Sequence, residues 1–111
     1  MVVETFFSVP VLDMDRATSF YTSALGARVA YASPRWTSIY IAGVRIGLFL
    51  HPESPGGATG LHFVVPDFAA ACAAIEQAGG QAAEHEIEVA PGVVTLAAID
   101  TEENGFTLRK A

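Results

Sequence analysis

The stretch Phe6–Tyr21, FFSVPVLDMDRATSFY, contains a change of hydrophobic period at a single residue. Its first half is apolar and β-prone, whereas from Asp13 onward the apolar side chains recur at helical spacing. The short carboxylate of Asp13 can accept hydrogen bonds from the free amides of a first helical turn. Gly26 suits the left-handed residue that ends a helix. The pattern predicts a strand at 4–12 and a helix at 13–25.

A second copy of this unit lies in the other half of the chain. Gly60–Asp67, GLHFVVPD, is again an apolar strand that ends in aspartate, and the helical pattern after it ends at Gly79 and Gly80. Asp13 in the first copy corresponds to Asp67 in the second. The repeat indicates a duplicated strand and helix.

Alternation and turn residues predict the other elements of each copy. We expect further strands at 28–32, 36–42 and 45–51, and in the second copy a strand at 60–66, a helix at 67–78 and strands at 81–89, 93–100 and 106–109. Segment 53–59 has the composition of a linker and is too short to separate two domains.

Each half therefore has the order βαβββ. We predict the fold class α+β, in which two tandem βαβββ modules form a curved mixed sheet with the helices on its outer face and a concave cavity on the other. Residues 1–111 are expected to form a single domain, with one module at about 1–52 and the other at about 60–111.

Composition also favours one compact domain, because 51% of the 111 residues are hydrophobic and 16% are charged. The net charge of −6 argues against a nucleic-acid partner and mildly favours a cationic ligand. The single cysteine, Cys72, excludes an intrachain disulfide and is interpreted as a small core residue. No apolar run reaches transmembrane length, and the N-terminus has no basic region. We therefore expect a cytoplasmic protein without a membrane partner.

Alternate residues of a strand point to opposite faces of the sheet, so a sheet covered by helices on one face presents its other residues to the concavity. By this rule the concave face carries Phe6, Ser8, Pro10, Trp36, Ser38, Tyr40, Arg45, Gly47, Phe49 and His51 from the first copy, and Gly60, His62, Val64, Gly105, Thr107 and Arg109 from the second. This face is where a ligand site is expected.

Three segments carry a resemblance to a known family. VPVLDMDRATSFYTSALG, the second copy HFVVPDFAAACAAIEQAGG and the closing IDTEENGFTL resemble the vicinal oxygen chelate superfamily, which includes glyoxalase I, bleomycin-resistance proteins, extradiol dioxygenases and fosfomycin-resistance enzymes. The resemblance covers nearly the whole chain and implies paired βαβββ modules, often completed by dimerisation. It does not define an activity, because this fold hosts metalloenzymes and metal-free binding proteins alike.

The resemblance also implies where a metal would be held. Enzymes of the family generally bind a divalent metal through His, Gln or Glu side chains on four strands, and these positions fall on Phe6, at or next to Gly47, on Gly60 and on Thr107. None of these residues is a usual metal ligand. We therefore predict no metal site and no other cofactor.

His62 is the nearest replacement for a missing ligand, because it lies two residues beyond Gly60 and hence on the same face. With His51 it would form part of a displaced metal site. Since two histidines alone rarely make a catalytic site, we favour a histidine of the cavity wall. His85 is expected at the surface.

The concave face offers aromatic walls with a few polar groups, which is the composition of a small-molecule pocket. The predicted ligand-binding residues are Phe6, Ser8, Trp36, Ser38, Tyr40, Phe49, His62 and Thr107. The same aromatic side chains would also suit a filled concavity or a dimer interface, where Trp and Tyr are enriched.

Two acidic segments allow alternative interpretations. Alternate residues of the predicted strand 81–89 are acidic, namely Glu84, Glu86 and Glu88. Their carboxylates would either hold a cationic ligand or protect a sheet edge against pairing, and we favour edge protection. Segment 102–105 is interpreted as a turn, in which Asn104 and Gly105 suit positive φ.

Two classes of function stay open. The favoured one is a metal-independent binding protein of the glyoxalase/bleomycin-resistance type, a homodimer that sequesters or carries an aromatic, hydrophobic or cationic ligand. The alternative is a lyase, isomerase or dioxygenase-like enzyme that uses a displaced metal, or His62 as a base with Tyr40 or Arg45 stabilising an anion. We favour binding because the sequence shows no set of nucleophile, base and orienting group. Whether the modules pair within one chain or across a dimer stays open.

Overall fold

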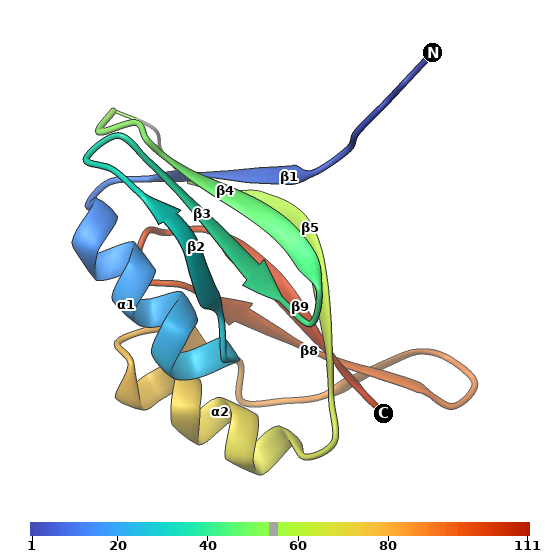
Figure 1. The fold of residues 1–111 in the computed structure, drawn as a ribbon. Helices are drawn as coiled ribbons and strands as arrows, with labels where there is room; N and C mark the ends of the chain where they lie inside the picture. The colour runs from blue at the N-terminus through green and yellow to red at the C-terminus, as the bar shows by residue number, and fades with distance from the viewer. Residues whose placement is uncertain (54–55) are drawn as a thin grey trace.

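The computed structural model describes residues 1–53 and 56–111, so Ser54 and Pro55 of the predicted linker lie outside the described residues. The chain forms two modules of strands with a helix in each, which confirms the predicted α+β class and the paired modules (Figure 1). The first module contains β1 (Phe7–Val11), α1 (Met14–Leu25), β2 (Arg28–Ala32), β3 (Trp36–Ile41) and β4 (Val44–Leu50). The second contains β5 (Ala58–Val65), α2 (Phe68–Gln77), β6 (Gln81–Ala82), β7 (Ile87–Ala90), β8 (Val93–Ile99) and β9 (Gly105–Lys110).

Both predicted helix starts are confirmed. The carboxylate of Asp13 accepts a hydrogen bond from the Arg16 amide at 3.0 Å, and that of Asp67 accepts one from the Ala69 amide at 2.9 Å. Gly26 ends α1 with a left-handed φ of 68°. Each helix therefore begins where the sequence places a short carboxylate. Neither of these described helices is long and apolar enough to cross a membrane.

The prediction of a single strand at 81–89 is wrong, because the segment forms two strands. β6 ends at Ala82, which pairs with Ala98 of β8, and β7 begins at Ile87, which pairs with Thr95. The chain between Ala82 and Ile87 is longer than the stretch of β8 that it faces. The intervening residues therefore loop out of the sheet.

Two strand starts also differ from the prediction. β5 begins at Ala58, so the end of the predicted linker 53–59 belongs to the strand, and the Thr59 hydroxyl donates to the Gly105 carbonyl of β9 at 2.8 Å. β1 begins at Phe7, where its pairing with β4 starts, and the residues before it form an arm that extends from the body (Figure 1). The remaining bounds differ from the prediction by at most one residue.

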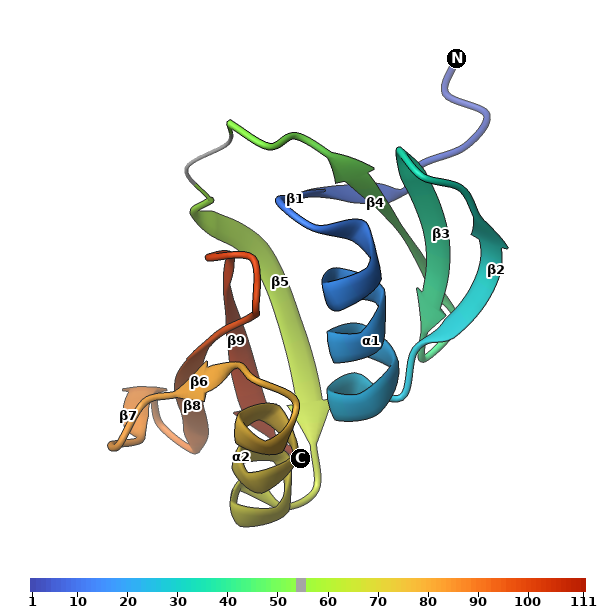
Figure 2. The ribbon, with the colours of Figure 1, turned by 90° about the vertical axis from the view of Figure 1, so that its left-hand side faces the viewer.

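The strands form two mixed sheets, one from each module. The first sheet has the order β1-β4-β3-β2, and the second has the order β5-β9-β8-β6, with β7 also paired to β8. In each sheet the first strand of the module runs parallel to the last, and the other neighbours are antiparallel. In Figure 2 the two sheets lie on either side of α1.

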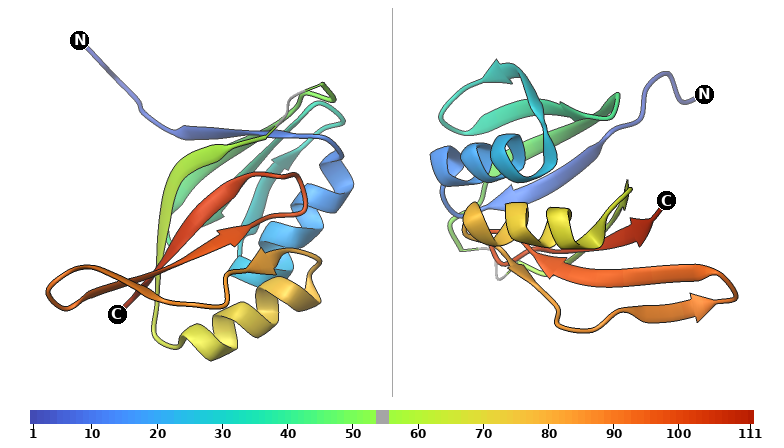
Figure 3. Two further views of the ribbon diagram at one scale, coloured as in Figure 1. Left: turned by 180° about the vertical axis from the view of Figure 1, so that it is seen from behind. Right: turned by 90° about the horizontal axis from the view of Figure 1, so that it is seen from below.

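Both helices lie between the two sheets (Figures 2 and 3). The Phe20 ring of α1 contacts Phe106 of β9, with 6.3 Å between ring centroids, and side chains from both modules join in one buried core. The helix-covered faces of the sheets therefore look toward each other. The opposite faces, which we call the open faces, look away from each other (Figure 3).

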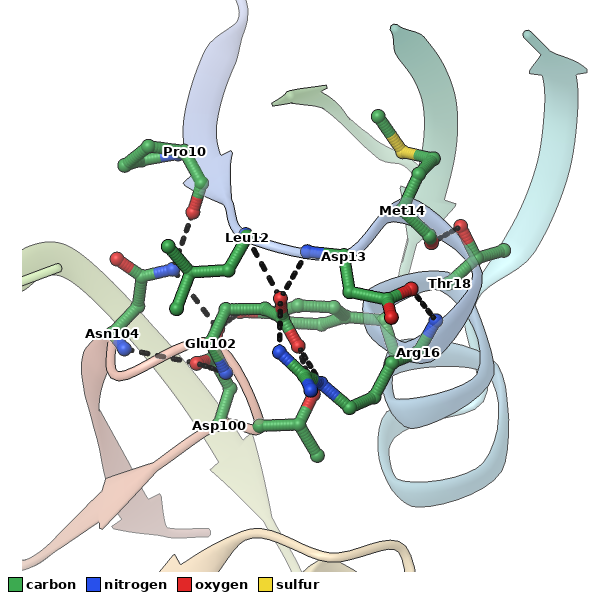
Figure 4. A network of polar contacts seen from close by, with 11 residues as sticks. Pro10, Leu12, Asp13, Met14, Arg16, Thr18, Asp100, Glu102 and Asn104 are labelled. Carbon is green, nitrogen blue, oxygen red and sulfur yellow. Dashed lines mark hydrogen bonds and ion pairs between the residues drawn. The ribbon is translucent and has the colours of Figure 1, made fainter. Parts of the chain in front are cut away.

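The turn between β8 and β9 joins the two modules through two buried carboxylates, those of Glu102 and Asp100 (Figure 4). Glu102 is 1% exposed, and its carboxylate accepts hydrogen bonds from the amides of Leu12 at 2.9 Å and Asp13 at 2.8 Å. It also accepts one from Nε of Arg16 at 2.8 Å, which makes an ion pair. In a capping box, a Glu at the third helical position bonds the amide of the capping residue. In α1 the third helical position is occupied by Arg16. The Glu that bonds the amide of the capping residue Asp13 is instead Glu102, from the other module.

Asp100 organises the same turn from within. Its carboxylate accepts hydrogen bonds from the amides of Glu102 at 2.7 Å and Asn104 at 2.9 Å. It also accepts one from the Tyr21 hydroxyl of α1 at 2.5 Å, and the Asn104 side chain donates to the carbonyl of Pro10 at 2.7 Å. Every buried side-chain polar atom in the described part of the chain has a partner, so the junction contains no uncompensated group.

The prediction of positive φ at Asn104 and Gly105 is wrong. Glu103 is the residue of this turn with a left-handed φ, at 68°, and Asn104 is buried at 1% exposure. Residue types that favour turns do not reveal which of them face inward. The contact with the other module holds Asn104 inward and leaves Glu103 at the exposed tip.

The junction shifts two ionisable groups. Burial opposes the ionisation of Glu102, but hydrogen bonds from Arg16, Thr101 and two backbone amides outweigh it and hold the pKa of Glu102 below its ordinary value. Burial, and after it the negative charge of Asp100, raises the pKa of the Tyr21 hydroxyl. Glu102 is therefore ionised and Tyr21 protonated at neutral pH, as the hydrogen bonds require.

We expect Glu102→Ala to lower the free energy of unfolding by about 3 kcal/mol, because two buried amides and a guanidinium lose their acceptor. Urea unfolding at pH 7 measures this change. Glu103→Ala removes the same charge from the exposed tip of the turn and should alter stability by less than about 0.5 kcal/mol. Equal effects of the two substitutions would contradict the assigned role of Glu102.

The lowered pKa of Glu102 also predicts how stability depends on pH. Because the pKa is lower in the folded than in the unfolded chain, the stabilisation is complete above the unfolded value and is lost as pH falls through the folded value. The stability difference between wild type and Glu102→Gln should therefore shrink from pH 6 to pH 3. Urea unfolding at each pH measures it, and parallel curves would contradict the prediction.

Candidate functional site

Strand pairing arranges the predicted ligand residues in rows across the open face of the first sheet, because directly paired residues share a face. The first row contains Arg28, Tyr40 and Arg45, the second Tyr31, Ser38, Gly47 and Ser8, and the third Trp36, Phe49 and Pro10. The structure thus places the residues of β1, β3 and β4 on the face that alternation predicts, and it adds Arg28 and Tyr31 of β2 to that face. Their role in binding stays a prediction.

The indole of Trp36 lies over Gly47. A Cβ atom added at Gly47 would come within 2.1 Å of the indole carbon Cζ2. The indole N–H donates to the Ser38 hydroxyl at 2.9 Å, and the Phe6 ring meets the indole edge-on, with 6.1 Å between centroids. Phe6 and Trp36 therefore form one aromatic group over the middle of the first sheet, and both rings keep exposed surface.

Two guanidinium groups lie over aromatic rings of the same face. Cζ of Arg28 lies 4.9 Å from the ring centroid of Tyr40, and Cζ of Arg45 lies 4.3 Å from that of Phe6. Arg45 also forms an ion pair with Glu4 of the N-terminal arm. The sequence reasoning identified Arg45 and Tyr40 and missed Arg28 and Glu4. The register of β2 on β3 is the signal that would have found Arg28.

The open face of the second sheet carries His62 together with several exposed apolar side chains. His62 pairs with Thr107 of β9, which pairs with Ala97 of β8. The exposed apolar residues on the strands of this face are Val64 at 62%, Ile87 at 61%, Val89 at 61% and Ile99 at 44% exposure. His62 is itself exposed. This face has the character of an interface more than of a polar catalytic site.

The structure does not bring the three candidate catalytic residues together within one chain. Tyr40 and Arg45 are paired neighbours on the first sheet, whereas His62 lies on the second. The two open faces look away from each other (Figure 3). A base and an anion-stabilising group must reach neighbouring atoms of one substrate. A single chain therefore contains no acid–base set made of these residues.

The residues at the positions implied for a metal do not fit a metal ion. The indole covers Gly47, and Gly60 has a left-handed φ of 76° where the pairing of β5 with β9 is irregular. Of the four positions only Thr107 has a side-chain oxygen, whereas a divalent metal takes several imidazole, carboxylate or thiolate groups. Within residues 1–53 and 56–111, no group of three or more His, Cys, Asp or Glu side chains is placed to hold a metal.

The surroundings of the two other histidines and of the single cysteine point to structural roles. His51 follows β4, and its ring meets that of Phe49 at 6.1 Å between centroids. His85 lies exposed between β6 and β7, as predicted. Cys72 is half-buried against the core, and burial raises the pKa of its thiol, which disfavours the reactive thiolate.

The alternating carboxylates do not line the open face. Glu84 and Glu86 lie in the stretch between β6 and β7, and Glu88 pairs with Val94, which packs against the core on the helix side. Ile87, opposite Thr95, occupies the open-face position of β7. Because β7 pairs with β8 alone, these charges belong to a sheet edge, which fits the edge-protection interpretation.

We call the open face of the first sheet, which carries Phe6 and Trp36, the aromatic face. Two clefts in the described part of the chain lie away from it. One, of about 720 Å³, runs between the modules and is lined almost entirely by apolar side chains of α1, α2, β4 and β5. The other, of about 760 Å³, lies between α1 and the residues around the β2–β3 turn. Of the predicted ligand-binding residues, only His62 borders either cleft.

Residues 5–108 match the model of the Glyoxalase/Bleomycin resistance protein/Dioxygenase superfamily. The chain belongs to this superfamily. The match confirms the resemblance that the sequence motifs carry, and it extends over both modules. None of the curated proteins matches the sequence of this superfamily member.

Solved structures share the fold of this superfamily member at low sequence identity. The fosfomycin resistance protein FosX from Listeria monocytogenes has a TM-score of 0.83 at 15% identity, over 100% of this chain and 94% of its own. The bleomycin-binding protein from Streptomyces verticillus, complexed with copper(II)-bleomycin, has a TM-score of 0.72 at 14% identity, over 100% and 98%. Lactoylglutathione lyase from Agrobacterium tumefaciens has a TM-score of 0.75 at 15% identity, over 99% and 95%. These likenesses show the fold and leave the activity open.

We expect Gly47→Ala to displace the indole of Trp36, because the new methyl group would overlap it. Since Trp36 is the single tryptophan, its fluorescence emission should shift to the red, and stability should fall by about 1–3 kcal/mol. Gly105→Ala is the matched control, because a Cβ there meets its nearest atoms at an ordinary 3.9 Å. An unchanged spectrum of Gly47→Ala would show that the indole does not lie over Gly47.

Proposed function

We propose that this superfamily member is a metal-independent, cytoplasmic binding protein that sequesters or carries a small molecule against the aromatic face of its first sheet. The indole of Trp36 over Gly47 is the observation that carries the proposal. It puts an apolar ring surface at a position where metalloenzymes of this fold would place a donor side chain. A planar apolar group is what such a surface holds best.

The proposed site offers ring surface with a limited number of polar groups. The indole N–H is satisfied by Ser38, so Trp36 presents its carbon surface to a ligand. The predicted contacts are Phe6, Ser8, Trp36, Ser38, Tyr40 and Phe49 from the first sheet, with His62 and Thr107 from the second. Such a site supports binding and orientation, and it lacks the donor set for a displaced metal.

We infer that a second copy of the chain completes the site. The open faces of one chain look away from each other, so the residues of the two sheets can meet over one ligand only across a dimer. The exposed Val64, Ile87 and Ile99 give the second sheet an apolar face that a partner would cover. The aromatic face of the partner's first sheet is the complementary surface, since both faces carry exposed apolar side chains.

The structural relatives support binding and keep an enzyme as the alternative. The bleomycin-binding protein shares the fold, and its structure contains the drug as a copper complex. Lactoylglutathione lyase shares the same fold and is an enzyme by name. The residues of this chain favour the binding role, because Tyr40 and Arg45 are separated from His62 within the chain.

We expect the neutral aromatic compound naphthalen-2-ylmethanol to bind with a change in Trp36 fluorescence. Phe6→Ala should weaken this binding at least about threefold, because it removes one wall of the aromatic group. Val44→Ala is the control, since it truncates an apolar side chain whose partner Ile41 lies on the helix side. Fluorescence titration gives the affinities.

The metal content of the protein tests whether it is metal-independent, and its molecular mass in solution tests whether it is a dimer. After incubation with Zn²⁺, Mn²⁺, Fe²⁺ or Ni²⁺ and desalting, elemental mass spectrometry should find no metal at a stoichiometric level. Retention of one metal per chain, together with turnover that His62→Ala abolishes, would replace binding by the enzyme alternative. Sedimentation should give the mass of a dimer, and a monomer that binds the compound would contradict the shared site.

A further inference from the structure

We propose that the ligand of the aromatic face is a planar aromatic anion, such as an aromatic carboxylate, whose negative group binds at Arg28 and Arg45. The inference rests on the proposed function and names its ligand class. It departs from the expectation, drawn from the net charge, that a cationic ligand is favoured.

Positive charge is concentrated on the open faces of an acidic chain. The sequence has 12 Asp and Glu against 6 Lys and Arg. Yet the open-face positions of the described strands carry Arg28, Arg45 and Arg109, and none of them carries Asp or Glu. Glu88, the acidic residue of β7, points to the helix side with its partner Val94. Apart from Glu4 of the N-terminal arm, which pairs with Arg45, a ligand on the open faces therefore meets a local positive field.

The two arginines of the first sheet stand on either side of one tyrosine. Arg28 pairs with Tyr40 across β2 and β3, and Tyr40 pairs with Arg45 across β3 and β4. Arg28 lies over Tyr40 and Arg45 over Phe6, so each guanidinium group is held against an aromatic ring. Guanidinium groups bind carboxylates through paired N–H donors. The row is therefore suited to a carboxylate.

The distance between rows matches a molecule with an acid group beside an aromatic system. Trp36 belongs to a row four residues along β3 from Tyr40, and its indole reaches back over Gly47 to the row between them. Two residues along a strand span about 7 Å. A ligand whose ring lies against the indole thus places a neighbouring carboxylate near the row of Arg28 and Arg45.

The N-terminal arm indicates how Arg45 accepts such a group. The Glu4 carboxylate forms an ion pair with the Arg45 guanidinium, with 60% of the Glu4 side chain and 32% of the Arg45 side chain exposed. Exposed ion pairs contribute little, so a carboxylate that is also held by ring stacking replaces Glu4. Glu4 therefore occupies the position of the ligand's acid group and competes with it.

Three probes with the same ring system test the inference in the full-length protein. They are naphthalene-2-carboxylate, naphthalen-2-ylmethanol and naphthalen-2-ylmethylammonium, titrated while Trp36 fluorescence is followed. The anion should bind about tenfold more tightly than the cation, with the neutral compound between them. The preference should weaken as salt is raised, because the site is open to solvent.

Variants assign the preference to named residues. Arg28→Gln and Arg45→Gln should each weaken binding of the anion about threefold to tenfold and weaken binding of the neutral probe by less than about twofold. Glu4→Gln should strengthen binding of the anion about threefold, because the competing carboxylate is removed. Lys110→Gln is the control for net charge, since Lys110 lies over Phe68 on the helix side.

The outcomes separate this inference from the proposed function. If the three probes bind equally, or if the cation binds most tightly, the inference fails and the binding function stands. If Arg28→Gln and Arg45→Gln lower anion affinity no more than Lys110→Gln does, the positive row is not the recognition element, and the inference fails. If none of the probes binds, both the inference and the proposed function fail.

Discussion

The carboxylate of Glu102 fixes how the two modules face each other. It holds the amides of Leu12 and Asp13 and the guanidinium of Arg16, so the turn between β8 and β9 is attached to the point where β1 becomes α1. Burial opposes the ionisation of a carboxylate, so an ionised Glu102 is stable there only because these bonds satisfy its oxygens. With the junction fixed, α1 lies between the sheets and the open faces point outward (Figure 3). The proposal that a second copy completes the ligand site rests on this arrangement of the modules, which the bonds from Tyr21 to Asp100 and from Asn104 to Pro10 also hold.

Local signals in the sequence were sufficient for most of the elements, and long-range contacts account for what they missed. Asp13 and Asp67 mark helix starts because a capping carboxylate acts on amides of the next turn. Glu102 carries no such signal, since its partners in the first module lie 86 to 90 residues away. The same reason explains the error at Asn104, whose position is set by Pro10 of the other module. The division of strand 81–89 depends on β8, which no local pattern reveals.

The sequence was sufficient to predict which face of the sheet carries the candidate site. It did not predict the contacts between the side chains on that face. Alternation places Trp36 and Gly47 on the same face of adjacent strands, because the side-chain period of a strand is fixed. Their contact depends on the rotamer of Trp36 and on its hydrogen bond to Ser38. A side chain at position 47 and an indole over it exclude each other. The absence of a metal-binding side chain at position 47 and the presence of the Trp36 ring over it therefore have one cause. Gly47 stands at a position implied for a metal because the indole leaves no room for a larger residue.

The charge distribution shows why net charge is a poor guide to the ligand. The chain has a formal charge of −6, but most of its carboxylates lie at the module junction, at helix starts, in turns and on edge strands, and Glu4 of the N-terminal arm is paired with Arg45. Each of these places has its own structural reason: capping of a helix, satisfaction of buried amides or protection of an edge. The open faces have no such need and carry arginine instead. The distant negative field repels anions in general, so an anion is held only where ring stacking is added to the guanidinium groups. The proposed selectivity for a molecule that is both planar and anionic rests on these two terms together.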